Sequence, residues 1–299
     1  MRSSYRRIGD YIELVDERNK DLSVDLLLGL SISKEFIPSV ANTVDTNMKN
    51  YKIIQKRQFA CSVMQVRRDK KMPIALLKDH KVGIISQAYP VFKIKDENKL
   101  LPQYLMMWFC RPEFDREACF YAVGGVRGSL EWEDFCNMKL PVPSIEKQQK
   151  LVAEYNTVVN RIKLNEQLNQ KLEETAQAVY RRWFVEFEEN KHAHLQEYVE
   201  TNPKLNLEKG TLAPYIEMAN ISETSFNISN MIYRRYKGGS RFQNNDTLLA
   251  RITPCLENGK TAFVNFLKED EVAAGSTEFI VMRAKENVSP YWVYCLAKD

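Results

Sequence analysis

Residues 146–188 have the sequence EKQQKLVAEYNTVVNRIKLNEQLNQKLEETAQAVYRRWFVEFE. Neither proline nor glycine interrupts the segment, and leucine, glutamate, glutamine, lysine and alanine, which are good helix formers, dominate it. A continuous helix of roughly 40 residues would be about 60 Å long at 1.5 Å per residue. One small domain cannot cover a helix of that length, so the segment predicts a long helix that needs a partner.

Apolar residues recur along this helix in steps of four and three, which approximates the seven-residue repeat of coiled coils. The predicted partner-helix seam comprises Leu151, Tyr155, Val158, Ile162, Leu172, Ala176, Val179 and Trp183. Asn165 and Asn169 fill a gap in the seam, where polar residues set the register of paired helices at some expense of stability. The pattern favours a spacer helix that also docks protein partners, with a solvated connecting rod as the alternative.

The whole chain has 299 residues, which predicts about two domains. Its content of 44% hydrophobic and 27% charged residues is typical of a folded protein. A net charge of +4 permits an anionic partner without requiring one. The cysteines lack CxxC spacing, the N-terminus lacks a secretory signal, and the longest apolar runs are far too short to cross a bilayer. We therefore expect a cytoplasmic protein with reduced thiols and no membrane partner.

The predicted domains are residues 1–144, the long helix 145–189, and residues 190–299. Pro141 and Pro143 give an extended segment before the helix, and Ser144 is placed to cap it. In the first domain, strands are expected within Leu26–Ser33, Asn50–Ser62 and Lys81–Ile94, and helices over Pro102–Phe109, Glu113–Tyr121 and Glu131–Cys136. This mixture predicts an α+β fold.

The second domain repeats features of the first. An apolar strand that ends in a basic residue occurs in both, as VFK at 91–93 and as IVMR at 280–283. A proline-started aromatic helix follows each, as LPQYL at 101–105 and SPYWV at 289–293. We therefore predict two copies of one domain, the second incomplete, with one long coiled-coil-type helix between them.

Signatures of catalysis are missing from the sequence, which has no GxSxG, phosphate-binding P-loop or HExxH motif. His192 and His194 would suggest a metal site only if further ligands joined them, so a polar linker is the prediction there. The glycine pairs at 124–125 and 238–239 lack a GxGxxG frame and predict turns. We expect a binding protein that is not an enzyme and holds neither metal nor cofactor.

Two clusters of cations are candidates for binding DNA, because Arg and Lys neutralise phosphates and Arg also contacts base edges. One is QVRRDKK at 65–71, and the other is YRRYKGGSR at 233–241, which is interleaved with tyrosines. Either cluster alone could be a solvated loop, but two clusters in copied domains favour DNA. The predicted DNA-binding residues are Arg67, Arg68, Lys70, Lys71, Arg127, Ser129, Arg234, Arg235, Lys237, Arg241 and Lys260.

Three longer stretches carry a family resemblance: DTLLARITPCLENGK at 246–260, AGSTEFIV at 274–281, and LPVPSIEKQQ at 140–149. With them the chain resembles the DNA-specificity subunits of type I restriction–modification systems, which serve in defence against foreign DNA. The resemblance implies two target-recognition domains that each recognise half of a split target in double-stranded DNA. It also implies paired antiparallel long helices that set the spacing of the half-sites and dock the methyltransferase (modification) subunits.

By the same resemblance the chain is a non-catalytic recognition subunit. S-adenosylmethionine is then expected on the methyltransferase partners, and ATP on the restriction (translocase) subunits. One long helix and an incomplete second recognition domain depart from the family pattern. We expect either a fragment or a truncated product able to pair with a second copy of itself through Leu151–Trp183. The alternative function is a protein–protein adapter that docks partners through its helix and does not recognise DNA.

Overall fold

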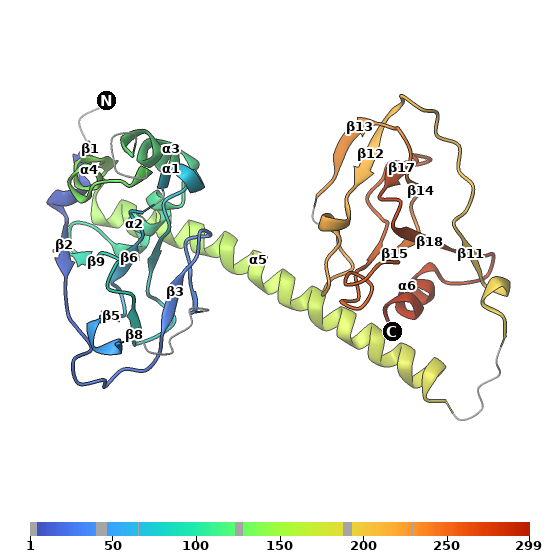
Figure 1. The fold of residues 1–299 in the computed structure, drawn as a ribbon, viewed down its shortest axis with the longest axis horizontal. Coiled ribbons are helices and arrows are strands. Elements are labelled where there is room, and N and C mark those ends of the chain that lie inside the picture. Colours follow the sequence, from blue (N-terminus) through green and yellow to red (C-terminus); the bar gives the residue numbers. More distant parts are fainter. Residues whose placement is uncertain (1–4, 40–46, 65, 123–127, 188–192, 229) are drawn as a thin grey trace. The chain divides into compact units, whose positions relative to one another are not determined.

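The computed structural model describes residues 5–39, 47–64, 66–122, 128–187, 193–228 and 230–299 (Figure 1). The chain divides into two compact units, residues 1–159 (unit 1) and 160–299 (unit 2). Helix α5 (Ile145–Tyr180) contributes residues to both units and continues as a π-helical turn over Arg181–Val185. The predicted α+β class with a long helix is confirmed.

The strands of unit 1 are β1 (Tyr5–Arg7), β2 (Ile12–Val15), β3 (Leu28–Leu30), β4 (Phe36–Pro38), β5 (Lys52–Gln55), β6 (Phe59–Cys61), β7 (Ile74–Leu76), β8 (Val82–Ile85), β9 (Val91–Ile94) and β10 (Lys139–Pro141). Its other helical elements are α1 (Val66–Asp69), α2 (Pro102–Phe109), α3 (Pro112–Tyr121), α4 (Trp132–Asn137) and the 3-10 turns η1 (Ile8–Asp10) and η2 (Met48–Asn50). Proline occupies the first turn of α2 and of α3, where its missing N–H costs no hydrogen bond.

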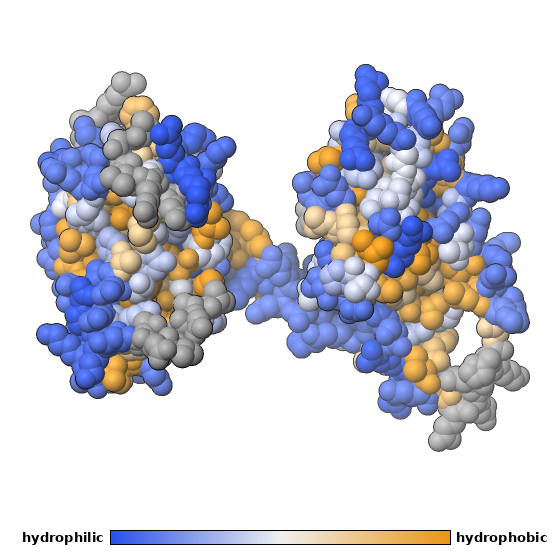
Figure 2. Space-filling model, in the orientation of Figure 1, coloured by the Kyte–Doolittle hydropathy of each residue, from blue (hydrophilic) through white to orange (hydrophobic). Residues whose placement is uncertain are grey.

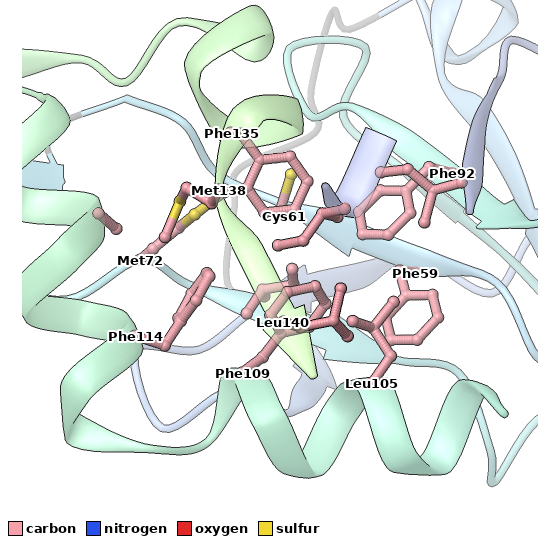
Figure 3. Close-up of a cluster of buried hydrophobic side chains, with 14 of the residues drawn as sticks. Phe59, Cys61, Met72, Phe92, Leu105, Phe109, Phe114, Phe135, Met138 and Leu140 are labelled. Atoms are coloured by element: carbon pink, nitrogen blue, oxygen red, sulfur yellow. The ribbon is translucent and has the colours of Figure 1, made fainter. Parts of the chain in front are cut away.

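Unit 1 is built on an antiparallel sheet of order β2-β9-β6-β7. The pairs β3–β4 and β5–β8 form a second sheet-like layer, joined by a parallel bridge between Leu27 and Ile84. Aromatic side chains from the sheet and from α2, α3 and α4 make the core (Figure 3). Phe59 and Phe92 stack with their centroids 5.0 Å apart on adjacent strands, and Phe109 packs edge-on against both.

The strands of unit 2 are β11 (Val199–Thr201), β12 (Leu212–Ile216), β13 (Ile232–Arg235), β14 (Ser240–Phe242), β15 (Asp246–Ala250), β16 (Thr261–Phe263), β17 (Ala273–Gly275) and β18 (Phe279–Ala284). The helical elements are α6 (Pro290–Lys298) and the 3-10 turns η5 (Leu195–Glu197) and η6 (Met218–Asn220). One antiparallel sheet has the order β11-β18-β15-β16, and the other has the order β13-β12-β17-β14.

Unit 2 repeats the topology of unit 1. The order β11-β18-β15-β16 corresponds to β2-β9-β6-β7, with a 3-10 turn before the first strand in both units. In the second layer of unit 2, β12 pairs in parallel with β17, and this pairing corresponds to the parallel bridge between Leu27 and Ile84 in unit 1. The antiparallel pair β12–β13 corresponds to β3–β4, and the pair β17–β14 corresponds to β8–β5. After the last strand, α6 corresponds to α2, and Val293 is buried at the position of Leu105. The predicted duplication is therefore present.

The repeat extends to single hydrogen bonds in the turn that enters the central strand. Asn245 has φ +72° and its N–H donates to Val264 O (2.8 Å), while Arg57 has φ +73° and donates to Leu77 O (2.8 Å). The next residue in each turn, Asp246 or Gln58, accepts a hydrogen bond at its side chain from the first residue of the turn. This turn fixes the alignment of the two units residue by residue.

Three local expectations change in the structure. Of Leu26–Ser33, only β3 is a strand and only Leu28 in it is buried, because β3 pairs with the short β4 at the surface. The basic segment 65–71, expected as a loop, includes the short helix α1, and the segment 233–241 begins on strand β13. The α-helical part of the long segment ends at Tyr180. The domain boundaries 1–144, 145–189 and 190–299 stay predictions.

Asp246 supplies the first stability test. Its fully buried carboxylate accepts two hydrogen bonds from Arg283, both 2.7 Å, and a third from the backbone N–H of Gln243. D246A leaves the guanidinium half-buried without its partner, so we expect unit 2 to lose roughly 3–5 kcal/mol of unfolding free energy. Urea unfolding measures this loss. The control is E97Q, which removes an exposed ion pair with Arg57 and is expected to cost at most about 1 kcal/mol. A D246A loss no larger than that of E97Q would contradict the assigned role.

Candidate nucleic-acid interface and the exposed face of the long helix

In unit 1 the predicted cations lie on the connection between β6 and β7. Val66 and Met72 are fully buried and anchor the two ends of the segment. Between these anchors Arg67, Lys70 and Lys71 are exposed. The segment is therefore held to the core by apolar residues while its charges face solvent.

Arg68 differs from its neighbours because Asp69 pairs with it. Its Nε lies 2.7 Å from Asp69 Oδ1, and a second bond joins Nη2 to Oδ2 at 3.2 Å. These hydrogen bonds lower the pKa of Asp69 and raise the pKa of Arg68. Arg68 thus brings little net charge to this surface, and Arg67, Lys70 and Lys71 bring most of it.

The second predicted loop of unit 1 lies beside the first. A Cβ built on Gly128 would come within 3.0 Å of Arg67 Cβ, and Gly128 has φ +75°, which a side chain would strain. Leu130 N–H donates to Val63 O at 2.9 Å and holds the end of this loop against the β6–β7 connection. The half-buried Ser129 therefore lies close to Arg67, and both are predicted to bind DNA. Arg127 lies outside the described residues.

In unit 2 the exposed cations belong to a β-ribbon at a sheet edge. β13 pairs with β12 on one side, and all four of its residues are exposed. The Arg234 guanidinium lies 3.2 Å from the centroid of the Tyr215 ring, and Arg235 donates to Gly210 O at 3.1 Å. Lys237 follows, also exposed. In Figure 2 much of the end of unit 2 that carries β12 and β13 is hydrophilic. Edge charges prevent pairing with other strands, and a two-stranded ribbon also fits the major groove.

Two further predicted residues of unit 2 are not on this ribbon. Lys260 is half-buried, and its Nζ lies 3.4 Å from the backbone oxygen of Met218. Arg241 is half-buried on β14 rather than in a loop. The structure thus brings Arg234, Arg235 and Lys237 together and places Arg241 and Lys260 elsewhere.

The two cation clusters occupy different positions of the repeat. Arg67–Lys71 connects β6 to β7, and its equivalent in unit 2 is the β15–β16 connection, which ends at Lys260. The Arg234–Lys237 cluster covers the end of β13 and the connection to β14, and its equivalent in unit 1 is β4 with the β4–β5 connection. The clusters are therefore separate features of two similar domains and not copies of one loop.

The predicted seam of α5 is largely exposed. The larger side chains from Tyr155 to Trp183 in the seam are 43–62% exposed, and Ala176 is also exposed. Leu151 differs, because it packs on the core of unit 1. Apart from Leu151, this apolar stripe is available to another protein surface.

Polar contacts fix which side of α5 faces each unit. In unit 1 the buried Gln148 accepts from Leu101 N–H and donates to Lys99 O and Pro143 O, each at 2.9 Å. In unit 2 the Glu173 carboxylate accepts from Phe226 N–H (3.2 Å) and from the Tyr294 hydroxyl. Burial and the Glu173 contact raise the pKa of Tyr294, so its hydroxyl keeps the proton that it donates.

With this geometry established, the chain can be compared with known proteins. Residues 33–174 match the family model described as the type I restriction modification DNA specificity domain. They cover most of unit 1 and the larger part of α5. The resemblance expected from the sequence is confirmed.

Individual relatives of this specificity domain are distant. The type I restriction enzyme HindI specificity subunit of Haemophilus influenzae is 28% identical over 107 residues, or 35% of this chain and 23% of that protein. A type I restriction-modification system S subunit from M. genitalium is similar in fold, with a TM-score of 0.52, 12% identity, and coverage of 98% of this chain and 76% of that one. The HsdS subunit of Thermoanaerobacter tengcongensis gives a TM-score of 0.41 at 16% identity, over 99% of this chain and 80% of that one.

Other kinds of site find no support in the described part of the chain. No group of three or more His, Cys, Asp or Glu side chains there could hold a metal ion. Within the same residues, none of the helices combines the length and the apolar character that crossing a bilayer requires. The six cysteines are free, and burial raises the pKa of Cys61, so its thiol stays protonated.

Sequence reasoning missed several residues of these surfaces. Gln148 and Glu173 orient α5, yet both look like ordinary polar residues of an exposed helix. Arg251 pairs with Glu278 at 3.0 Å, and it lines the same pocket as Arg241. From the sequence, the segment that contains Arg251 indicates only a family resemblance and does not identify Arg251 as a site residue. An alignment of the two repeats gives a signal for Arg251, because the equivalent residue of unit 1 is the apolar Val63.

A pair of truncations tests which face of α5 is packed. Tyr180 is 6% exposed and packs with Phe263 and Tyr294, whereas Leu172 is 59% exposed. We expect Y180A to lower the unfolding free energy of unit 2 by about 3 kcal/mol and L172A to change it by less than about 0.5 kcal/mol. Urea unfolding at low protein concentration measures both. Equal losses would show that the seam is packed within the chain.

Proposed function

We propose that this chain is the DNA-specificity subunit of a type I restriction–modification complex. Each unit acts as a target-recognition domain for one part of a split site in double-stranded DNA, and the chain itself catalyses nothing. The observation that carries the proposal is the duplication: a domain matching the specificity family occurs with a second copy of the same hydrogen-bonded topology. Both copies present exposed cations, and two recognition domains on one chain suit a target in two parts.

In unit 1 the DNA contacts are assigned to Arg67, Lys70 and Lys71, with Ser129 beside them; Arg127 is also assigned, from the sequence alone. In unit 2 they are assigned to the ribbon cations Arg234, Arg235 and Lys237. Phosphate contacts from these side chains supply most of the affinity and make it sensitive to salt. The ribbon is also suited to reach base edges, because a pair of β-strands fits the width of the major groove.

The exposed seam of α5 is assigned to protein partners. An apolar stripe along a long helix fits another helix, contributed by a methyltransferase subunit or by a second copy of this chain. S-adenosylmethionine then belongs to the methyltransferase subunits and ATP to the restriction (translocase) subunits, which the chain positions on DNA. The complex works in the cytoplasm, where it meets foreign DNA.

Co-expression with the methyltransferase subunit of the same system tests the function. We expect a stable complex whose methylation of random-sequence DNA is confined to one split motif. A palindromic motif would indicate one recognition domain used twice, and an asymmetric motif would indicate two different ones. A stable complex that binds all DNA weakly and uniformly would instead identify a protein–protein adapter.

Charge removal tests the unit 1 surface. Replacing Arg67, Lys70 and Lys71 by Gln is expected to reduce the slope of log affinity against log salt by about 0.9 for each phosphate that is no longer neutralised. R68Q should change the slope less, because Asp69 already pairs with that arginine. Fluorescence anisotropy with duplex DNA at several salt concentrations measures these slopes.

The matched control for this triple variant is K20Q, which removes an exposed charge on the β2–β3 connection. It should leave the slope unchanged. A triple variant that behaves like K20Q would remove the β6–β7 connection from the interface.

A further inference from the structure

A polar pocket of about 250 Å³ lies in unit 2, where the end of β11, the start of β14, the end of β15 and the start of β18 meet. The residues that line it include Arg241, Arg251, Thr277, Asn202 and Ser240. Ser240 Oγ donates to Phe279 O at 3.0 Å, and Asn202 Oδ1 accepts from Val281 N–H at 3.0 Å, which directs the amide donors of Asn202 away from that bond. The lining of the pocket thus includes several polar residues, two of them cationic.

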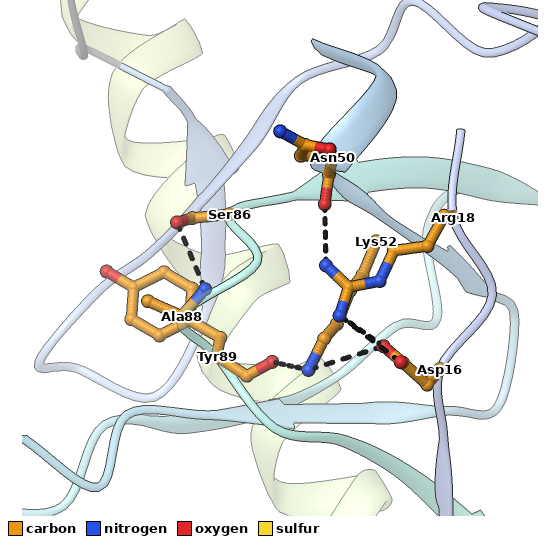
Figure 4. A network of polar contacts seen from close by, with 7 residues as sticks. All are labelled: Asp16, Arg18, Asn50, Lys52, Ser86, Ala88 and Tyr89. Atoms are coloured by element: carbon orange, nitrogen blue, oxygen red, sulfur yellow. Dashed lines mark hydrogen bonds and ion pairs between the residues drawn. The ribbon is translucent and has the colours of Figure 1, made fainter. Parts of the chain in front are cut away.

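The equivalent place in unit 1 is occupied by the chain's own charges (Figure 4). Lys52 stands at the position of Ser240, and its Nζ donates to Tyr89 O at 2.9 Å, the counterpart of the Ser240–Phe279 bond. Asp16 lies 3.8 Å from this Nζ and 2.8 Å from the Arg18 guanidinium. A single internal carboxylate, Asp16, therefore pairs with both cations at this place in unit 1.

Unit 2 has no such carboxylate at the equivalent position, because Pro203 replaces Asp16 in the alignment of the repeats. Arg241 and Arg251 meanwhile replace the apolar residues Ile53 and Val63 of unit 1. The fold of this domain therefore does not need arginine at either position. Desolvating a guanidinium is costly unless an anion compensates it.

The charges around the pocket leave one cation in excess. Arg251 pairs with Glu278, whose carboxylate also accepts from the Thr277 hydroxyl at 3.2 Å. The ion pairs among the described residues of unit 2 involve Lys171, Arg181, Arg251 and Arg283, and Arg241 is in none of them. Arg241 is thus a half-buried residue of the pocket lining that has no ion-pair partner in the described part of the chain. An external anion would balance its charge.

We propose that this pocket binds a phosphate group, with Arg241 as its principal cation and Arg251 and Asn202 as further donors. Guanidinium groups bind phosphate through paired, charge-assisted hydrogen bonds, and the cavity is large enough for one phosphate with part of its ester. The phosphate is either a phosphodiester of bound DNA or a free phosphomonoester. The first source rests on the proposed function, and the second does not.

The test compares the full-length chain with R241I, which installs the residue that unit 1 carries at this position and so should preserve the fold. Inorganic phosphate is titrated against the melting temperature, with potassium chloride at matched ionic strength as the reference. We expect phosphate to raise the melting temperature of the wild type above the chloride reference. R241I should weaken the apparent phosphate affinity by about tenfold or more, the effect of removing a charge-assisted hydrogen bond. R241K keeps the charge without the paired donors and should lie between the two.

The matched control is K268I, which removes an exposed positive charge of unit 2 that does not line the pocket. It should keep the wild-type response to phosphate. Equal phosphate stabilisation of wild type and R241I, or no stabilisation of the wild type beyond chloride, would overturn the proposal.

Fluorescence anisotropy with duplex DNA distinguishes a phosphodiester of DNA from a free phosphomonoester as the ligand of the pocket. A salt slope that falls by about 0.9 in R241I assigns the pocket to a DNA phosphate. An unchanged slope, together with the disappearance of phosphate stabilisation, assigns it to a free phosphomonoester. A wild-type chain that binds no DNA would contradict the proposed function, and the phosphate titration would still decide the pocket.

Discussion

The buried amide of Gln148 holds the first turn of α5 in place, and the rest of the surface depends on this constraint. An amide buried without partners would cost several kcal/mol, so its three hydrogen bonds permit essentially one rotation of the helix about its axis on unit 1. Glu173 does the same on unit 2 with its contacts to Phe226 and Tyr294. The larger apolar side chains of the seam beyond Leu151 remain exposed.

Units 1 and 2 share one topology but carry different charged surfaces. The strand orders, the turn before the central strand and the proline-started helix recur, so the core of each unit is built by the same rules. The exposed cations lie at different positions in the two units: unit 1 carries them between β6 and β7, and unit 2 carries them on the ribbon. Backbone pairing and apolar burial determine the fold, and the connections are free to carry different chemistry.

The sequence predicted the elements that have strong local signals. The glycine-free, proline-free run that begins near Ser144 indicated α5, and Pro102 and Pro290 marked helix starts that the structure confirms. The three-residue strand β17 had no such signal, because it is too short for periodicity and its residues are small. Its place beside β12 comes from pairing over a long sequence distance. The environment of Arg241 is equally non-local, since the pocket joins segments from Asn202 to Val281.

All ten residues from 161 to 170 in α5 are exposed, so no globular surface covers this stretch of helix. An isolated helix of that length is only marginally stable in water. Here the segment is stabilised by helical continuity with the anchored turns on either side of it. Its amide hydrogens should therefore exchange with solvent much faster than those of the two cores. A protein bound along the seam would slow this exchange. The exchange rate of the amide hydrogens at the centre of α5 would therefore show whether a partner is bound to the seam.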